Sequence, residues 1–161
     1  MDTLTFTPIT NHRAGTIFSL LRESYAPIWN DKLEENLRKA DRGAFENPDT
    51  IGACTFITCL DGQPIGFASY DPRQGPDLAI IGHNCILPEY QQRGFGRQQI
   101  TEVLRRLKAK GFHKVVVTTS DHPFFAPAQR MYQSCGFRES RRFKQSQHAP
   151  CRTIEYEIEL K

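Results

Sequence analysis

The apolar residues of this chain follow a helical period in some stretches and a strand-like pattern in others. The clearest helical stretch carries Ile100, Val103, Leu104 and Leu107 at i, i+3, i+4 and i+7, with arginines and lysines between them. This spacing predicts an amphipathic helix with one buried face and one solvated face. An apolar, strand-like stretch at residues 78–87 precedes it, and the polar segment 91–97 separates the two.

The remaining pattern predicts strands and helices in a fixed order. The N-terminal part contains a strand at 4–9, a helix carrying Ile17, Leu20 and Leu21 that Thr10 or Asn11 caps, and a second helix that Asn30 or Asp31 caps and that ends at 41–43. Strands at 52–60 and 64–70 then form a hairpin around Asp61-Gly62, and a turn at 73–76 leads into the strand at 78–87. We therefore expect a three-strand meander at this point.

The C-terminal part continues the alternation. Gly111 ends the amphipathic helix, a β-branched strand covers 114–119, a helix covers 126–134 with Gly136 as its stop, and strands at 137–143 and 153–160 form a closing hairpin. No internal repeat interrupts this order.

The segment 91–97 has the composition of an anion-binding turn. Gly94 and Gly96 permit positive φ and close backbone approach, and the helix that follows points its unpaired N–H groups and positive dipole end at the turn. Arg93 and Arg97 add charge. The alternative is a strand-to-helix connection whose glycines serve steric needs. The segment lacks the G-x-x-x-x-G-K-[ST] string and the three glycines of a Rossmann turn.

Two motifs together resemble the GNAT N-acetyltransferase superfamily. Gln91, Gly94 and Gly96 fill the fixed positions of its acetyl-CoA signature, [QR]-x-x-G-x-[GA]. Downstream, the second signature, A-x-x-x-Y-x-x-x-G-F, is matched at Ala128, Tyr132, Gly136 and Phe137. The resemblance covers nearly the whole chain. It implies an α/β GNAT acyltransferase fold in a single domain over residues 1–161, with a mixed, mostly antiparallel central sheet of about six to seven strands and helices on both faces.

The resemblance also implies which residues bind acetyl-CoA. The pantetheine arm would pair with a strand edge, and the Ile86 N–H would stabilise the oxyanion of the tetrahedral intermediate. The expected acetyl-CoA-binding residues are Asn84, Cys85, Ile86, Gln91, Gln92, Arg93, Gly94, Phe95, Gly96 and Arg97.

Tyr132 occupies the general-acid position of the family, and its alternative role is that of a buried aromatic residue. Because a phenol is a weaker acid than a thiol, a hydrogen bond to the departing sulfur is the safer role. The family often has asparagine seven residues earlier, where this chain has Phe125, so Ser120 or Asp121 would have to substitute.

The acceptor amine must lose a proton before it attacks. The candidates for the base are His83, Glu89, Glu23 and a water chain, and each of the three residues also has a purely structural interpretation. The aromatic connection formed by Tyr25, Pro27, Ile28 and Trp29 lies where the fold admits its acceptor, although core contacts would explain this composition equally well.

Length and composition agree with a single globular domain. The chain has 161 residues, 39% of them hydrophobic, and a net charge of +3, which does not by itself indicate a nucleic-acid or membrane partner. Five cysteines form no C-x-x-C pair, so we expect reduced, mostly buried thiols and assign no metal site. The chain shows neither a signal-peptide pattern nor an apolar run long enough for a membrane span, and we expect it to be cytoplasmic.

The resemblance therefore implies an N-acetyltransferase that moves the acetyl group of acetyl-CoA to a primary amine of a small molecule or peptide by direct attack in a ternary complex. Cys85 could instead act as a nucleophile. A second alternative is a non-catalytic acyl-CoA-binding or sensing module, and a third is a nucleic-acid-binding protein using the basic residues of 93–110, which a solvated helix face explains better. The identity of the acceptor, the acyl chain and the oligomeric state stay open, with a homodimer among the alternatives.

Overall fold

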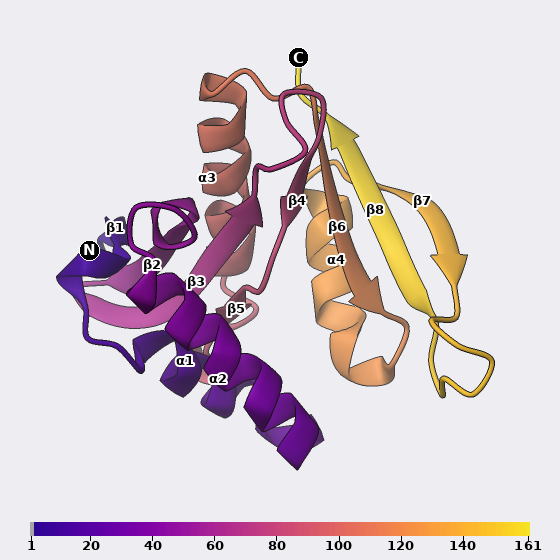
Figure 1. The fold of residues 1–161 in the computed structure, drawn as a ribbon, viewed down its shortest axis with the longest axis horizontal. Coiled ribbons are helices and arrows are strands. Elements are labelled where there is room, and N and C mark those ends of the chain that lie inside the picture. The colour runs from indigo at the N-terminus through magenta and orange to yellow at the C-terminus, as the bar shows by residue number, and fades with distance from the viewer. Residues whose placement is uncertain (1) are drawn as a thin grey trace. The chain divides into compact units, whose positions relative to one another are not determined.

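The computed structural model describes residues 2–161. The chain divides into two compact units that alternate along the sequence. The first contains the residues up to Tyr70 together with Gly82–Gln99, and the second contains Asp71–Ile81 together with Ile100–Lys161. Figure 1 labels the elements.

The helices are α1 (Thr16–Ser24), α2 (Asp31–Glu46), α3 (Phe95–Ala109) and α4 (Ala126–Ser134). The strands are β1 (Leu4–Pro8), β2 (Thr55–Leu60), β3 (Gln63–Asp71), β4 (Ala79–Ile81), β5 (Cys85–Ile86), β6 (Lys114–Ser120), β7 (Arg138–Phe143) and β8 (Thr153–Glu159).

The first unit is built on an antiparallel arrangement of β1, β2, β3 and β5. β2 pairs with β1 on one side and β3 on the other, and β3 also pairs with β5. The hairpin between β2 and β3 turns at Asp61 and Gly62, which both have positive φ, as the Asp-Gly pair predicts. Successive side chains of a strand point to opposite faces of its sheet. In β2, Ile57 and Cys59 lie on one face and Thr58 lies on the other face.

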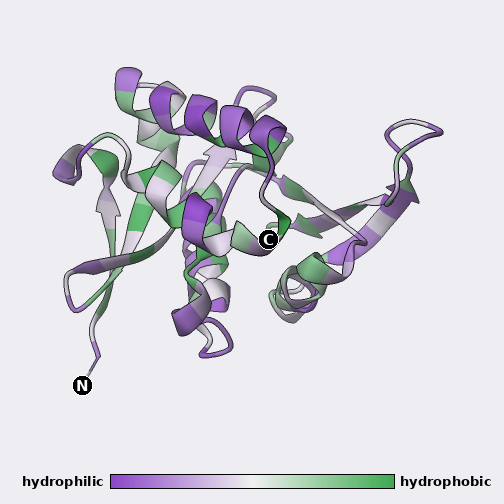
Figure 2. Cartoon of the chain, turned by 90° about the horizontal axis from the view of Figure 1, so that it is seen from below, coloured by the Kyte–Doolittle hydropathy of each residue, from purple (hydrophilic) through white to green (hydrophobic). Residues whose placement is uncertain are grey.

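Helices cover both faces of this sheet. α1 and α2 lie on one face (Figure 1). They bury Ile17, Leu21 and Leu37 in one apolar cluster with Ile57 and Phe67. On the other face, Phe95 at the start of α3 belongs to a second apolar cluster, whose other buried members are Leu60, Ile65 and Ile86. The helix ribbons change between hydrophilic and hydrophobic colour within each turn, as expected for elements with one buried face (Figure 2).

The start of α1 differs from the prediction. Thr10 and Asn11 lie in a 3-10 turn, and α1 begins after Gly15 without a capping side chain of its own. Instead, the buried carboxylate of Asp41 on α2 accepts the N–H groups of Gly15 at 3.0 Å and Phe18 at 2.9 Å. The cap thus comes from a residue that is distant in sequence, which no local pattern reveals.

α2 is also longer than predicted. The cap at Asn30 is confirmed, since its side chain accepts the Leu33 N–H at 2.8 Å. The predicted end at 41–43 is wrong, because α2 continues to Glu46 and places Asp41 on its inner side. Asp41, which the sequence pattern places at a helix end, is instead buried against the start of α1.

The second unit contains the strands β4, β6, β8 and β7, which are neighbours in that order. β4 and β6 are parallel, and the other two pairs are antiparallel. α4 packs on this sheet through Tyr132, whose ring lies 6.1 Å from that of Tyr156 on β8. The predicted bounds of α4 are confirmed, and Gly136 ends it with a φ of 100°. With one parallel pair among the described strand pairs, the mixed, mostly antiparallel α/β fold is confirmed.

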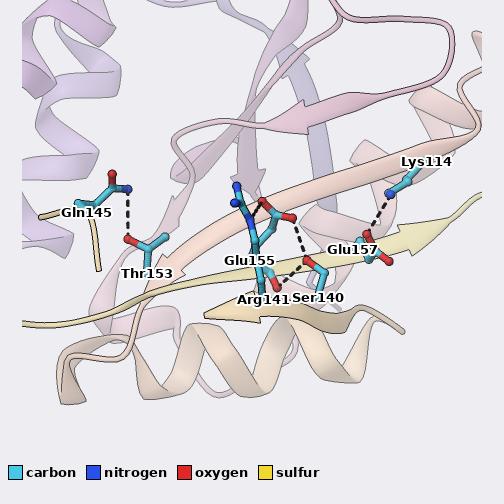
Figure 3. Close-up of polar contacts among 7 residues, drawn as sticks. All are labelled: Lys114, Ser140, Arg141, Gln145, Thr153, Glu155 and Glu157. Carbon is cyan, nitrogen blue, oxygen red and sulfur yellow. Dashed lines mark hydrogen bonds and ion pairs between the residues drawn. The ribbon is translucent and has the colours of Figure 1, made fainter. Parts of the chain in front are cut away.

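The closing hairpin is also confirmed, and its outer strand is polar. Every residue of β7 except Phe143 is exposed, and the strand is mainly hydrophilic in colour in Figure 2. Ion pairs join neighbouring strands, from Lys114 to Glu157 at 3.0 Å and from Arg141 to Glu155 at 3.1 Å (Figure 3). These exposed pairs add little to stability individually.

The predicted strand at 78–87 is interrupted. It forms β4 and β5, separated by Gly82, His83 and Asn84. Ser69 of β3 accounts for the break, because its carbonyl accepts the Gly82 N–H and its hydroxyl donates to the His83 carbonyl at 2.8 Å. A Cβ at residue 82 would lie 2.7 Å from the Ser69 hydroxyl oxygen, so a larger residue there would force the Ser69 side chain to shift.

Two expectations from composition can be compared with the structure. Cys59 and Cys85 are buried, whereas Cys54, Cys135 and Cys151 are half-buried, so the expectation of mostly buried thiols is wrong for these three. Among the described residues, no helix has the length and apolar character needed to cross a membrane. The prediction of a single domain stays a prediction.

Candidate active site

The glycine segment forms a turn with two left-handed residues. Gln92 has a φ of 62° and Gly94 a φ of 85°, and α3 begins at the next residue, Phe95. A Cβ added to Gly94 would meet no atom within 4 Å, so the space above the turn is open. Alternating left-handed residues next to a helix start form the kind of concave N–H surface that binds anions. The backbone therefore fits the phosphates of a polyanionic ligand.

Gly96 does not have the positive φ that glycine permits. It lies inside α3 and is not among the glycines with positive φ, so the expectation that both glycines turn the backbone is wrong for this residue. The second left-handed position belongs to Gln92 instead. Gly96 occupies the first helical turn, where its missing Cβ still permits close approach of a ligand.

The side chains of the turn mostly contact the protein itself. Gln91 donates from Nε2 to the Ile86 carbonyl at 2.8 Å and so ties the turn to the end of β5. Arg93 is half exposed, pairs with Asp2 at 3.4 Å and lies over the ring of Phe95. Phe95 is buried, so only its backbone can face a ligand, whereas Gln92 and Arg97 are exposed.

Residues 84–86 lead directly into this turn. Asn84 donates from its side chain to the Gly82 carbonyl at 3.1 Å. Cys85 is 8% exposed, and burial raises the pKa of its thiol to about 12, against a smaller lowering by the hydrogen bond with Ser24. The thiol is therefore neutral at physiological pH and unsuited to nucleophilic attack.

A cavity of about 420 Å³ in the first unit brings two of the candidate bases together. Arg22, Glu23 and Ala26 line it from the end of α1 and the turn that follows, and Pro88 and Glu89 line it from the segment after β5. Neither glutamate has an ion-pair partner among residues 2–161, and the Arg22 guanidinium lies over the Trp29 ring at 4.4 Å. The cavity therefore has two carboxylates available to an incoming cation.

The third candidate base, His83, is not among the residues that line the cavity. Its own surface is exposed, yet enough protein surrounds the imidazole for desolvation to lower its pKa. A neutral imidazole could accept a proton, but the structure does not bring it together with the two glutamates in the cavity.

Tyr132 and its neighbourhood lie in the second unit. Tyr132 is 4% exposed and its ring lies 5.8 Å from that of Phe137. Phe125 precedes α4 and packs edge-on against Phe124 at 4.9 Å. Both candidate substitutes for the family asparagine contact local backbone, since Ser120 accepts the His122 N–H and Asp121 accepts the Arg152 N–H. Within residues 2–161 no group of three potential metal-binding side chains occurs.

The comparison with known proteins agrees with this geometry. The profile of the Acetyltransferase (GNAT) family matches residues 15–137 of the chain. The chain belongs to this family. The match contains α1, α2, the glycine turn and Tyr132, and so covers every residue discussed above except those before Gly15 and the closing hairpin.

Individual relatives resemble this chain in sequence or in fold. The aminoglycoside N(6')-acetyltransferase type 1 of Salmonella typhimurium is 33% identical over 95 residues, which is 55% of this chain and 64% of that protein. The chain thus spans less than two thirds of this relative's length. A GNAT-family protein from Desulfovibrio desulfuricans has a TM-score of 0.79 at 17% identity, covering 99% of both chains. yncA from Salmonella typhimurium, solved with acetyl-CoA, has a TM-score of 0.72 at 18% identity over 99% of this chain and 94% of its own.

Sequence reasoning missed two features of this region. Arg22 and Ser24 lie at the end of α1 beside the cavity and the Ile86 carbonyl, and nothing in their spacing sets them apart. Gln99 is buried on α3, and here a signal existed. It lies four residues after Phe95 and four before Val103, so it is a polar residue on the apolar face of the helix.

Proposed function

We propose that this protein transfers the acetyl group of acetyl-CoA to a primary amine by direct attack in a ternary complex. The observation that carries the proposal is the backbone of the glycine turn, with Gln92 and Gly94 left-handed at the start of α3 and Gln91 tied to the end of β5. A phosphate-binding turn is thereby attached to a strand whose backbone can pair with an extended ligand.

The proposed binding mode uses the chain's backbone more than its side chains. The N–H groups at the start of α3 would hold the diphosphate, and the exposed guanidinium of Arg97 would add charge. Leu87 donates to the Ile65 carbonyl of β3 at 2.7 Å, and successive N–H groups of a strand point to opposite sides. The Ile86 N–H therefore points away from β3, as required for pairing with the acetyl carbonyl.

The proposed chemistry is a single displacement. The neutral amine nitrogen attacks the thioester carbonyl carbon, so that a C–N bond forms and the C–S bond breaks. The proton that the nitrogen then loses balances the proton that the departing sulfur takes up, and coenzyme A leaves as a thiol. Ile86 N–H would stabilise the oxyanion, and the Tyr132 hydroxyl would donate a hydrogen bond to the sulfur. The neutral, buried thiol of Cys85 favours this direct route over an acyl-enzyme.

The cavity beside Glu23 and Glu89 would accept the amine. A primary amine arrives as an ammonium ion, which carboxylates attract, and one of them can take the proton before attack. Polycationic acceptors such as aminoglycosides fit this charge, and the partial relative acts on that class by name. We therefore favour small, multiply charged amines over peptides as acceptors.

The test is coenzyme A release across a panel of aminoglycosides, polyamines, amino acids and peptides, with mass analysis of the product. The wild-type protein should release thiol with at least one multiply charged amine. Tyr132→Phe should lower kcat by about ten- to a hundredfold while its affinity for coenzyme A changes by less than about twofold, because the hydroxyl acts on the leaving sulfur.

Tyr156→Phe supplies the control, since Tyr156 is equally buried and lies outside the proposed reacting groups. It should retain wild-type kcat at temperatures well below its melting point. Tight binding of coenzyme A without thiol release for any amine would instead support a non-catalytic binding module. An absence of binding would remove the proposal altogether.

A further inference from the structure

Gln99 is a buried polar residue near β5 whose chemistry the proposed function does not yet use. It is 1% exposed, and its amide joins two strands of the first unit. Its Oε1 accepts the Thr58 hydroxyl of β2 at 2.6 Å, and its Nε2 donates to the Cys85 carbonyl of β5 at 3.3 Å. The two contacts together fix which way the amide points.

The sheet leaves room for this amide at one position of β3. Gly66 lies opposite Ile86 in the strand pairing. A Cβ at residue 66 would overlap the Cys85 carbonyl oxygen and would lie 3.1 Å from Gln99 Oε1. Glycine at this position therefore allows Gln99 to reach the backbone of β5, which an ordinary side chain would block.

The Cys85 carbonyl and the Ile86 N–H belong to the same planar peptide group. A hydrogen bond that holds the carbonyl therefore also sets the direction of the N–H, and it polarises the peptide so that the N–H becomes a stronger donor. The next peptide is held as well, because the Ile86 carbonyl accepts from Gln91 at 2.8 Å and from Ser24 at 3.4 Å.

We infer that Gln99 is a positioning residue for acetyl transfer. It holds the Cys85–Ile86 peptide so that the Ile86 N–H points at the developing oxyanion, with Thr58 orienting its amide. The inference rests on the proposed function. Gln99 lies inside α3, the helix that begins at the glycine turn. Its hydrogen bond to the Cys85 carbonyl would connect this helix to the Ile86 N–H, which stabilises the oxyanion.

The test compares two identical substitutions on neighbouring residues of α3. Gln99→Met keeps the length of the side chain but cannot donate to the Cys85 carbonyl. Gln98→Met makes the same change at an exposed position. Gln99→Met should lower kcat about tenfold, less than the hundred- to thousandfold typical of deleting an oxyanion donor, with coenzyme A affinity changed by less than about twofold. Gln98→Met should match the wild type.

A spectroscopic measurement separates positioning from a structural role. The carbonyl stretch of acetyl-CoA labelled with carbon-13 in the acetyl group should move to lower frequency on binding the wild type, and by a smaller amount on binding Gln99→Met. Thr58→Val, which retains Gln99 but removes its orienting hydroxyl, should show an intermediate shift and provides a second variant if Gln99→Met does not fold.

Wild-type kcat and a wild-type carbonyl shift in folded Gln99→Met or in Thr58→Val would overturn the inference while leaving the proposed function intact. A wild-type protein that neither binds acetyl-CoA nor shifts its carbonyl band would overturn both. A lower kcat together with a smaller carbonyl shift, at unchanged coenzyme A affinity, supports the inference.

Discussion

Cys85 and Ile86 are adjacent, but their surroundings give them different chemistry. The Cys85 side chain belongs to the apolar cluster under α1 and α2, and that of Ile86 belongs to the cluster around Phe95. Adjacent strand residues point to opposite faces, so one thiol is sealed in the core while the backbone beside it stays available at the strand edge. The side chain of Cys85 thus serves packing, and its peptide serves binding.

Replacing Cys85 by alanine should therefore leave the chemistry intact. We expect kcat within about twofold of wild type and a loss of about 1–2 kcal/mol in stability from the small cavity left behind. Because the pKa of the thiol is about 12, the wild-type residue should also resist iodoacetamide at pH 8. Half-buried Cys151 serves as the internal control for alkylation. Complete inactivation of Cys85→Ala with an unchanged melting temperature would instead indicate a covalent intermediate.

At the level of secondary structure, local signals predicted most of the architecture. The Asp61-Gly62 turn, the Asn30 cap and the stop at Gly136 are each made by residues that set their own backbone geometry, and all three are confirmed. The errors occur where a distant residue decides the outcome. Asp41 caps α1 from another helix, and Ser69 breaks the strand at Gly82. Such contacts have no signature in the local sequence.

The same distinction applies to the candidate site. The glycine turn at the start of α3 could be predicted, because glycines and a helix start leave a pattern along the chain. The cavity could not, since Glu23 and Glu89 are far apart in sequence and only the fold brings them together. For Gln99, the sequence shows a polar residue on an apolar helix face. Its contact with the Cys85 carbonyl could not be predicted from the sequence.

The glycine turn provides a test at the level of the element. Gly94 and Gly111 flank α3, have φ values of 85° and 87°, and both face open space where a Cβ would lie. Alanine at either position should cost about 1–2 kcal/mol, because a Cβ strains the left-handed conformation. Only Gly94→Ala should also weaken coenzyme A binding, by about tenfold in calorimetry. Equal affinities for the two variants would show that the turn does not hold the ligand.

α3 also carries a pH-dependent contribution to stability. Arg105 and Arg106 contact Glu102 at 2.8 and 2.6 Å, and the hydrogen bond from Arg105, followed by that from Arg106, lowers the pKa of this carboxyl to about 2 against the opposing effect of burial. Since the pKa is depressed in the folded state, the stabilisation is complete above the unfolded value of 4.5 and is lost as the pH falls towards 2.

Glu102→Gln should therefore lower the free energy of unfolding by about 1 kcal/mol at pH 7, as two helical ion pairs suggest. The difference from wild type should shrink steadily between pH 4.5 and 2 in urea titrations. Glu35→Gln, which removes an exposed pair with Lys39, should have a smaller effect. A difference for Glu102→Gln that stays constant down to pH 2 would rule out the carboxylate as its origin.

The net positive charge of the whole molecule repels the proposed polycationic acceptor. The chain carries a formal charge of +3, which repels a polycation at long range, so attraction has to come from the local field of the cavity. Glu23 and Glu89 are the carboxylates that line it. Such a field acts over about 10 Å at 0.1 M salt and is screened at higher ionic strength.

Glu23→Gln and Glu89→Gln should each raise the KM of a multiply charged acceptor about three- to tenfold at low salt, as expected for the loss of one nearby charge in a partly exposed site. The effect should weaken in 0.5 M salt and for an acceptor with a single charge. Glu46→Gln makes the same change in net charge at an exposed position at the end of α2. If all three variants raised KM equally, the long-range field of the protein would govern capture and the cavity would not be the acceptor site. A rise confined to residues 23 and 89 would place the acceptor beside them.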